Sequence, residues 1–234
     1  MLTKRHDFIQ YFINKNAGKN YLEIGVDQGN VFFSIQVKNK IAVDPEFKFD
    51  RFKKLTRYIA KPNRHALLSN LNAKYFEITS DDFFAKHKPT EKFDVCFIDG
   101  MHEFDYSTRD AINCLDHLTD NGVIILHDCN PLNKEEEISF ADWKKRGFTG
   151  GWKGDVWKTI VYLKCFRKDL DVCVVDTDQG LGIVRKKKSN ASDVAYAFNF
   201  KDDAEIRNLD YGFFEQNRVA LLGLIGVEEF NKTL

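Results

Sequence analysis

Apolar and polar residues follow one another in blocks that predict alternating strands and helices. Short apolar runs predict strands at residues 21–26, 40–44, 75–78, 93–98 and 123–126. Stretches with apolar residues three or four positions apart predict helices at 3–16, 50–59 and 106–118, and another from the second glycine of a turn to about Val37. This alternation is typical of a doubly wound, mainly parallel α/β sheet with right-handed crossovers.

The last third of the chain changes pattern. Two apolar runs, 170–175 and 181–184, flank Asp178-Gln179-Gly180 and predict an antiparallel pair. Residues 129–154 are glycine-rich and predict an insertion or lid loop, after which Asp155 is expected to cap a helix. Asn121-Gly122 is expected to end the preceding helix. The predicted fold is therefore a Rossmann-like, seven-stranded sheet with an antiparallel C-terminal strand.

The pattern also predicts how the chain is organised. We expect one domain over residues 1–188 and a helical C-terminal extension over 189–234, which packs on the domain or forms an oligomer contact. The apolar segment 219–227 is the candidate surface for a homo-oligomer or a packed cap. At nine residues it is the longest apolar run, and a membrane span needs about 20, so no span is expected.

Composition narrows the choice of partners and compartment. Basic and acidic residues number 35 each, and this zero formal charge argues against nucleic acid as the main partner. Five cysteines without CxxC spacing, and an N-terminus without an apolar core, predict a reduced cytoplasmic protein without a signal peptide.

Polar residues follow most of the predicted strands. Because ligands bind at the carboxyl ends of parallel strands, these residues predict the site. They are Glu23 with Gly25, then Asp44, Ser80, Asp99 and Asp128.

The first strand leads into a turn with two glycines, Gly25 and Gly29. A dinucleotide-binding turn has a glycine between them, but this chain has Asp27, whose charge would repel a pyrophosphate. Asp44 follows Gly25 by 19 positions, close to the offset of about 20 at which an acid binds a ribose diol. The alternative is that Asp44 caps the next turn. The pattern favours an adenosyl ligand without phosphate, such as S-adenosylmethionine.

Four segments, LEIGVDQG, IAVDP, FDVCFIDGMH and GVIILHD, resemble in order and spacing the motifs of class I S-adenosylmethionine-dependent methyltransferases. The nearest pattern is a bacterial subgroup of small-molecule and glycan O-methyltransferases with DGxH and HD motifs. The resemblance spans about residues 20–130 and implies a cofactor site. In it Glu23 and Gly25 bind the methionine part, Asp44 binds the ribose, and Ser80 and Asp81 lie near the adenine. Asp99 lies near the sulfonium and the acceptor. Val26, Asp27 and Gly29 of the turn are further expected cofactor-binding residues. Asp27 departs from the small residue usual in the family.

His102, in the DGxH motif, is the candidate general base, because an unperturbed imidazole has a pKa near ~6.5. The alternative is that His102 orders its loop by bonding to a carboxylate such as Asp99 or Asp105. Asp99 and Asp128 complete the expected catalytic group.

Similarity to catechol-type methyltransferases implies a second cofactor, Mg²⁺, which acidifies the acceptor hydroxyl. Asp99 and Asp128 match two metal-binding positions, but Cys129 replaces the usual asparagine and Asn130 comes one place late. The implied ligands are Asp99, Asp128 and Asn130. The alternative is that Asp128 orients His102 or the acceptor directly.

The predicted function is transfer of a methyl group from S-adenosylmethionine to a hydroxyl of a small molecule, sugar or glycan. Trp152 is the candidate acceptor wall, whereas Trp157 is expected in the core. Two alternatives stay open: an NAD- or nucleotide-sugar-dependent oxidoreductase, which the missing middle glycine disfavours, and a non-catalytic binding module on the same fold.

Overall fold

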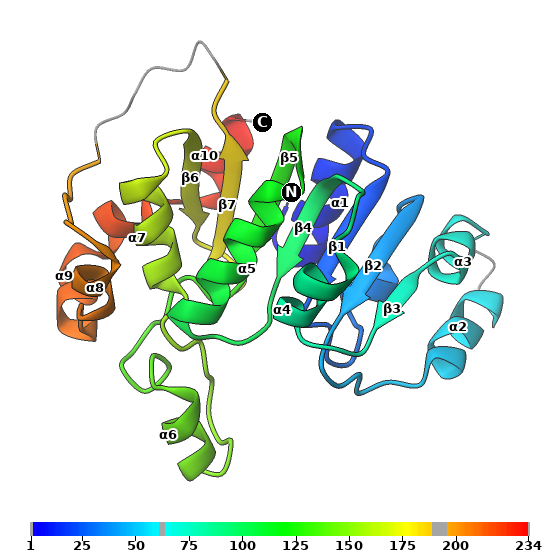
Figure 1. Cartoon of the computed structure of the whole chain (residues 1–234), viewed down its shortest axis with the longest axis horizontal. Helices are drawn as coiled ribbons and strands as arrows, with labels where there is room; N and C mark the ends of the chain where they lie inside the picture. Colours follow the sequence, from blue (N-terminus) through cyan, green and yellow to red (C-terminus); the bar gives the residue numbers. More distant parts are fainter. Residues whose placement is uncertain (1, 61–63, 189–195, 234) are drawn as a thin grey trace. The chain divides into compact units, whose positions relative to one another are not determined.

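The computed structural model describes residues 2–60, 64–188 and 196–233 (Figure 1). It contains one eight-stranded sheet with the strand order β3-β2-β1-β4-β5-β7-β6-β8. The chain divides into two compact units. We call residues 4–100 with 109–124 the N-terminal unit, and residues 1–3, 101–108 and 125–234 the C-terminal unit.

Parallel strands form the centre of the N-terminal unit. β1 (Asn20–Ile24) pairs in parallel with β2 (Asn39–Val43) and with β4 (Phe93–Ile98), and β2 pairs with β3 (Lys74–Phe76). Most residues of β1, β2 and β4 are buried, as expected for strands covered on both faces. The helical segments are α1 (Arg5–Lys15), α2 (Arg51–Ala60), α3 (Arg64–Leu71), α4 (Ser80–Asp82) and the π-helical turn Phe83–His87.

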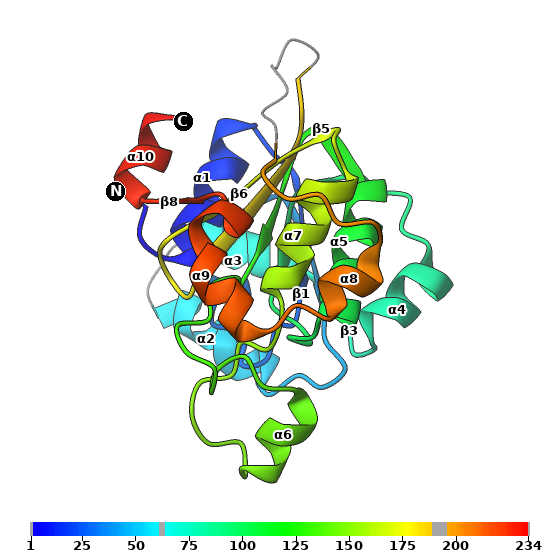
Figure 2. The same ribbon diagram turned by 90° about the vertical axis from the view of Figure 1, so that its left-hand side faces the viewer.

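The C-terminal unit is built on an antiparallel pair. β6 (Leu170–Val175) pairs antiparallel with β7 (Leu181–Lys186) and parallel with β8 (Leu224–Ile225). Figure 2 shows α7 (Trp157–Phe166) beside α8 (Asp203–Arg207) and α9 (Tyr211–Leu222). The remaining helices are α6 (Phe140–Lys145) and α10 (Val227–Lys232). Trp157 is fully buried, as predicted, and its ring lies 4.5 Å from that of Phe214.

Two elements contain residues of both units. They are α5 (Phe104–Asp116) and β5 (Leu118–Leu126), and β5 brings the chain to His127-Asp128.

The predicted fold class is confirmed, with an eighth strand, β8, beyond the expected seven. The predicted helix from Gly29 to Val37 is wrong, because only the 3₁₀ turn Phe32–Ser34 forms there. The backbone carbonyls of this segment bond to side chains instead. The Lys40 ammonium donates to the carbonyls of Phe32 and Ile35, at 2.6 and 3.0 Å. An apolar sequence pattern indicates which residues are buried, but it does not indicate that a side chain will compete with the helix for its backbone carbonyls.

Two local predictions are corrected. The helix before β5 ends at Asp116, and Asn121-Gly122 lies inside the strand. A Cβ at Gly122 would meet the Leu118 side chain at 2.6 Å, so this glycine serves close packing. Asp155 does not cap α7, whose N-cap is Val156, because its carboxylate accepts instead from the Phe104 N–H at 2.6 Å.

The expected boundary between a domain and an extension at residue 188 stays a prediction, and residues 189–195 lie outside the described part. In the segment 219–227, Leu221 and Leu222 are buried, whereas Val219 is exposed. Among the described residues, the helices are all too short or too polar to cross a bilayer.

Candidate active site

The turn after β1 is held close to the end of β4. Gly25 has a φ of +80°, and a Cβ at this position would lie 2.1 Å from the Asp99 carbonyl oxygen. The Asp99 N–H donates to the Ile24 carbonyl at 2.8 Å. Gly25 is therefore required by the close approach of two backbones as well as by its left-handed conformation.

Asp44 organises this turn. One carboxylate oxygen accepts from the backbone N–H groups of Val26 and Asp27, at 2.7 and 2.9 Å, and the other accepts from the Glu46 N–H at 2.8 Å. The last bond caps the turn after β2, which was the alternative role considered for Asp44. Ribose binding by Asp44 stays a prediction.

The other predicted residues of the turn differ in exposure. Val26 is buried, whereas the Asp27 carboxylate is largely exposed and pairs with the Lys48 ammonium at 3.2 Å. Asp27 and Gly29 both have positive φ, +45° and +71°. A Cβ at Gly29 would meet the Phe33 ring at 2.8 Å. The turn is thus a tightly folded loop with one acidic side chain at its surface.

Glu23 lies in the interior of the N-terminal unit. It is 1% exposed, and one carboxylate oxygen accepts from the Tyr21 hydroxyl at 2.5 Å. Burial raises the pKa of Glu23 to about 8, although Tyr21 and the nearby Lys40 oppose that shift. Burial also lowers the pKa of Lys40 to about 7. A largely protonated acid in the core is an unusual partner for a cofactor ammonium, and the role of Glu23 in binding the cofactor stays a prediction.

The expected adenine region begins α4. Thr79 caps this helix by accepting from the Asp82 N–H. Both carboxylate oxygens of Asp81 accept from the Arg109 guanidinium, at 3.1 and 2.9 Å. Ser80 bonds to the buried carboxyl of Asp110, whose pKa is raised to about 7 mainly by burial. Ser80 and Asp81 therefore connect α4 to α5, and their contact with adenine stays a prediction.

His102 of the C-terminal unit is held by both ring nitrogens. Its Nδ1 lies 3.0 Å from the backbone carbonyl oxygen of Trp152, and its Nε2 lies 3.3 Å from Oδ2 of Asp128. A carbonyl oxygen accepts but cannot donate, so Nδ1 carries the hydrogen. In the neutral imidazole, Nε2 is then the unprotonated atom. This is the nitrogen that faces Asp128.

Asp128 is placed by an unusual backbone. Its φ is +58°, which is uncommon for a residue other than glycine and is found often at functional sites. The β-turn before β7 holds the following residues, because the N–H groups of Cys129 and Asn130 donate to the carbonyls of Gly180 and Gln179, both at 3.1 Å. The carboxylate of Asp128 also accepts from Nδ1 of His127 at 2.8 Å.

The two residues after Asp128 have other partners. Cys129 is buried, and its thiol lies near the carbonyls of Leu126 and His127. The Asn130 side chain accepts from Arg218 at 2.6 Å and donates to Asp176 at 3.1 Å. Metal binding by Asn130 stays a prediction, and it would have to compete with Arg218.

Backbone and aromatic contacts hold His102 in place. A Cβ at Gly154 would lie 1.6 Å from the His102 carbonyl oxygen, which in turn accepts from the Asp155 N–H at 3.2 Å. The Trp152 ring stacks on His102 and on Trp143, each with a 4.8 Å centroid distance. Its indole N–H donates to the Ile138 carbonyl at 2.7 Å. The Trp152 ring thus packs on His102, and its role as an acceptor wall stays a prediction.

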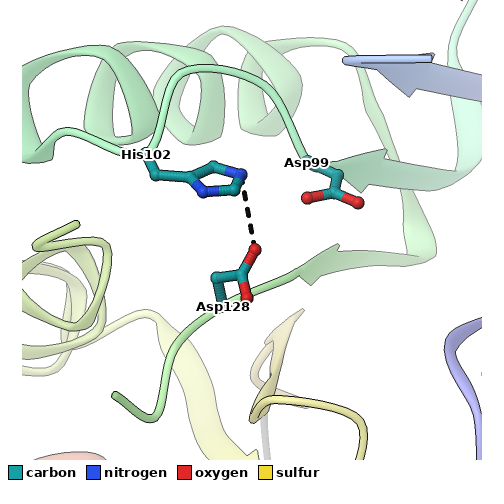
Figure 3. A group of neighbouring side chains, drawn as sticks. All are labelled: Asp99, His102 and Asp128. Atoms are coloured by element: carbon teal, nitrogen blue, oxygen red, sulfur yellow. Dashed lines mark ion pairs between the residues drawn. The ribbon is translucent and has the colours of Figure 1, made fainter. Parts of the chain in front are cut away.

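The three expected catalytic residues come together. Asp99, His102 and Asp128 each offer one atom, and these atoms lie within 4.8 Å of one another. Figure 3 shows Asp99 after β4, His102 in the loop before α5, and Asp128 after β5, with the imidazole directed toward Asp128. In the N-terminal unit, Arg5 of α1 donates to Asp99 at 2.9 Å.

Sequence reasoning missed several partners of these residues. Arg5 at the start of α1, Asp110 within α5 and Arg218 within α9 carry no motif, so spacing alone could not find them. His127 was part of the HD motif but received no role of its own. Its Nε2 lies 3.7 Å from Asp178, which extends the array of polar groups around Asp128.

Comparisons with known proteins show a match to a methyltransferase domain and a shared fold. Residues 22–129 match the protein family described as a methyltransferase domain. The fold is similar to an O-methyltransferase from Bacillus cereus in complex with SAH, at 15% identity and a TM-score of 0.52, over 78% of this chain and 80% of that chain. It is also similar to the O-methyltransferase TomG from Streptomyces achromogenes, involved in tomaymycin synthesis and in complex with SAM. That match has 11% identity and a TM-score of 0.54, over 79% of this chain and 80% of that chain. The search of curated proteins found no match.

Proposed function

Because residues 22–129 match a methyltransferase domain and the fold is similar to that of O-methyltransferases in complex with SAH or SAM, we propose that the protein is a class I S-adenosylmethionine-dependent methyltransferase. In this proposal it transfers the methyl group to a hydroxyl oxygen, with His102 as the general base. The observation that carries this proposal is the arrangement of His102, with its Nδ1–H held by the Trp152 carbonyl and its Nε2 beside Asp128. A base of this kind suits a hydroxyl acceptor, which must lose a proton as it attacks.

The proposed reaction is a single displacement, in which methyl transfer and proton transfer occur together. The acceptor oxygen attacks the methyl carbon as its proton passes to Nε2 of His102, and the bond between that carbon and the sulfonium sulfur breaks. The products are the methyl ether, neutral S-adenosylhomocysteine and an imidazolium. Asp128, 3.3 Å from Nε2, stabilises the positive charge that forms on the ring. The Trp152 carbonyl keeps the ring in the tautomer that this step needs.

A divalent ion such as Mg²⁺ is compatible with the two carboxylates. Oxygen is the preferred ligand of this ion, and Asp99 and Asp128 each offer an oxygen within the same 4.8 Å group. When bound there, such an ion would lower the pKa of the acceptor hydroxyl. The ion would have to share Asp99 with Arg5. Titration of the protein with Mg²⁺ by calorimetry tests this part, and Asp99→Asn should abolish any binding that is detected.

We propose a small molecule carrying a hydroxyl on a ring as the acceptor, such as a phenol or a sugar. Two features support this class. The residues that hold His102 belong to an aromatic cluster, and Phe148, about half exposed, extends that cluster to the surface. The O-methyltransferases of similar fold include TomG, which is involved in tomaymycin synthesis. A glycan also carries ring hydroxyl groups, so it could accept a methyl group by the same reaction.

The direct test is transfer of labelled methyl from S-adenosylmethionine to a panel of catechols, other phenols, monosaccharides and short glycans. We expect S-adenosylmethionine to bind and at least one hydroxyl compound to be labelled. Absence of binding by S-adenosylmethionine and S-adenosylhomocysteine in calorimetry would overturn the proposal. Saturable binding of NADH, followed by its fluorescence, would favour the oxidoreductase alternative. Cofactor binding without any labelled acceptor would favour a binding module.

A further inference from the structure

A strongly basic cavity lies in the C-terminal unit. Its volume is about 590 Å³, and α7, β6, β7 and α9 contribute to its lining. Seven basic side chains line it: Lys164, Arg167, Lys168 and the run 185–188. Among its described lining residues the acidic one is Asp171. This concentration contrasts with the chain as a whole, in which 35 basic residues balance 35 acidic ones.

Among the described residues, acidic groups at the rim pair with Arg185 and Arg167. Arg185 donates to Asp171 at 2.6 Å, and Arg167 donates to both oxygens of Asp169, at 2.9 and 2.7 Å. Within the described part of the chain, the seven basic residues and the two acids named here give a formal excess of five positive charges. Such a concentration of like charge raises the local potential and favours a multivalent anion.

Lys164 places part of this charge inside the fold. It lies in the last turn of α7, and its ammonium donates to the Val172 carbonyl at 3.1 Å and lies 5.1 Å from the centre of the Tyr196 ring. Burial lowers its pKa. Gly223 has a φ of +58°, and a Cβ there would come within 2.7 Å of this ammonium. Gly223 therefore leaves room for the Lys164 ammonium at a place where burial disfavours its positive charge. A bound anion would stabilise that charge.

The cavity is at the opposite end of β7 from Asp128. The turn before β7 bonds to the residues after Asp128, through the carbonyls of Gln179 and Gly180. β7 ends at Lys186, which pairs in register with Leu170, the first residue of β6. Six residues of extended strand span on the order of 20 Å. This cavity is therefore separate from the group around His102.

We infer that this cavity is a second ligand site, which binds a small organic anion carrying two or more phosphate groups. A diphosphate concentrates several negative charges in a volume that fits the cavity, because small-molecule sites measure roughly 300–1,000 Å³. Lysine and arginine side chains are the usual protein partners of phosphate oxygens. The site is independent of the methyl acceptor and of the assignment of His102 as the base.

A polynucleotide is the competing occupant, and the structure disfavours it. The positive charge is gathered in one cavity, whereas proteins that follow a nucleic-acid strand have an extended basic groove with aromatic rings that are open for base stacking. Tyr196 is the aromatic residue of the lining, and its ring is already approached by the ammonium groups of Lys164 and Lys168, at 5.1 and 6.0 Å.

The test is calorimetric titration of the full chain with inorganic pyrophosphate and with ADP. We expect saturable binding to one site that weakens as salt concentration rises. The double variant Lys164→Gln/Lys168→Gln should weaken pyrophosphate binding about tenfold or more. The matched control Lys144→Gln/Lys145→Gln, which removes two exposed charges on α6, should leave it within about twofold.

A second variant covers the case in which the first does not fold. Lys187→Gln/Lys188→Gln changes two residues of the rim beyond β7 and is expected to weaken pyrophosphate about threefold or more. Three results would overturn the inference: no saturable binding up to ~5 mM pyrophosphate, equal losses in the cavity and control variants, or tighter binding of a single-stranded oligonucleotide that increases with its length. Methyl transfer plays no part in these measurements, so they stand apart from the test of the methyltransferase.

Discussion

Asp44 and Asp128 occupy similar places in the sequence pattern but have different surroundings. Asp44 directly follows the buried strand β2, and Asp128 lies two residues after the end of β5. Each side chain is less than a tenth exposed. The carboxylate of Asp44 accepts from three backbone N–H groups. The carboxylate of Asp128 instead faces two imidazole rings, those of His102 and His127.

The difference separates an acid that shapes a loop from an acid that is placed to serve the proposed proton transfer. Backbone N–H groups do not titrate, so the bonds of Asp44 fix a conformation and little else. Imidazoles gain and lose protons near neutral pH, so the charge opposite Asp128 can change during a reaction. The following predictions test this contrast, from the largest expected effect to the smallest.

Removing the proposed base should have the largest effect. His102→Gln should lower kcat about 10³-fold, and Asp128→Asn about 10²-fold, with the affinity for S-adenosylhomocysteine unchanged. Steady-state kinetics with an acceptor found in the panel measures the first quantity, and calorimetry the second. His117→Gln is a matched control, because the Nδ1 of His117 also bonds to a backbone carbonyl, that of Asn113. Equal kcat values for His102→Gln and the wild type would refute the role of His102.

The buried acid before the turn should make the stability of the fold depend on pH. The pKa of Glu23 is raised from 4.5 to about 8, so the folded state holds more protons than the unfolded state between these values, and stability falls as pH rises. From pH 5 to 7 the wild type should lose about 2 kcal/mol through this group. Lys40, with a pKa lowered to about 7, has the opposite effect only above that pH.

Urea unfolding at pH 5, 6 and 7 measures this effect. Glu23→Gln should remove most of the decrease in unfolding free energy that the wild type shows over this range. A variant with the same pH dependence as the wild type would mean that Glu23 is ionised in the folded protein.

Loss of the charge on Asp44 should affect cofactor binding more than chemistry. Asp44→Asn removes charge-assisted bonds to two N–H groups of the turn, and it should weaken S-adenosylhomocysteine binding about tenfold while kcat at saturation changes less than about threefold. Asp50→Asn is the control, because Asp50 also accepts from two backbone N–H groups, those of Phe52 and Lys53, but at an exposed helix start. A larger loss in kcat than in affinity would place Asp44 with Asp128 instead.

The smallest effect is expected from the ring that stacks on His102. Trp152→Phe keeps an aromatic ring and the backbone carbonyl but loses the bond to the Ile138 carbonyl. It should lower kcat about threefold, and Trp152→Ala about tenfold, because His102 is then less well held. Nitrogen chemical shifts of the labelled imidazole report the tautomer directly. An unchanged tautomer ratio and kcat in Trp152→Ala would show that stacking has no part in positioning the base.

The sequence predicted the parallel core well because strands buried on both faces are almost continuously apolar. β4 was predicted with its observed bounds, Phe93–Ile98, and α1 and α2 were predicted to within two residues. The predicted helix after the turn failed because its carbonyls bond to Lys40, a residue of the next strand. A side chain as long as that of lysine can reach a neighbouring segment, and local periodicity in the sequence does not predict which carbonyls it will contact.

For the candidate site, the sequence determined which residues lie at the ends of strands. The order of strands and the DGMH and HD segments were enough to select Asp99, His102 and Asp128, because parallel strands end at one edge of a sheet. Only the tertiary structure decided what each group faces. It turned Asp44 toward backbone N–H groups, brought the Trp152 carbonyl from 50 positions away to Nδ1 of His102, and enclosed Glu23 with Tyr21. Periodicity determines burial, whereas hydrogen-bond partners depend on distances between segments that are remote in the chain.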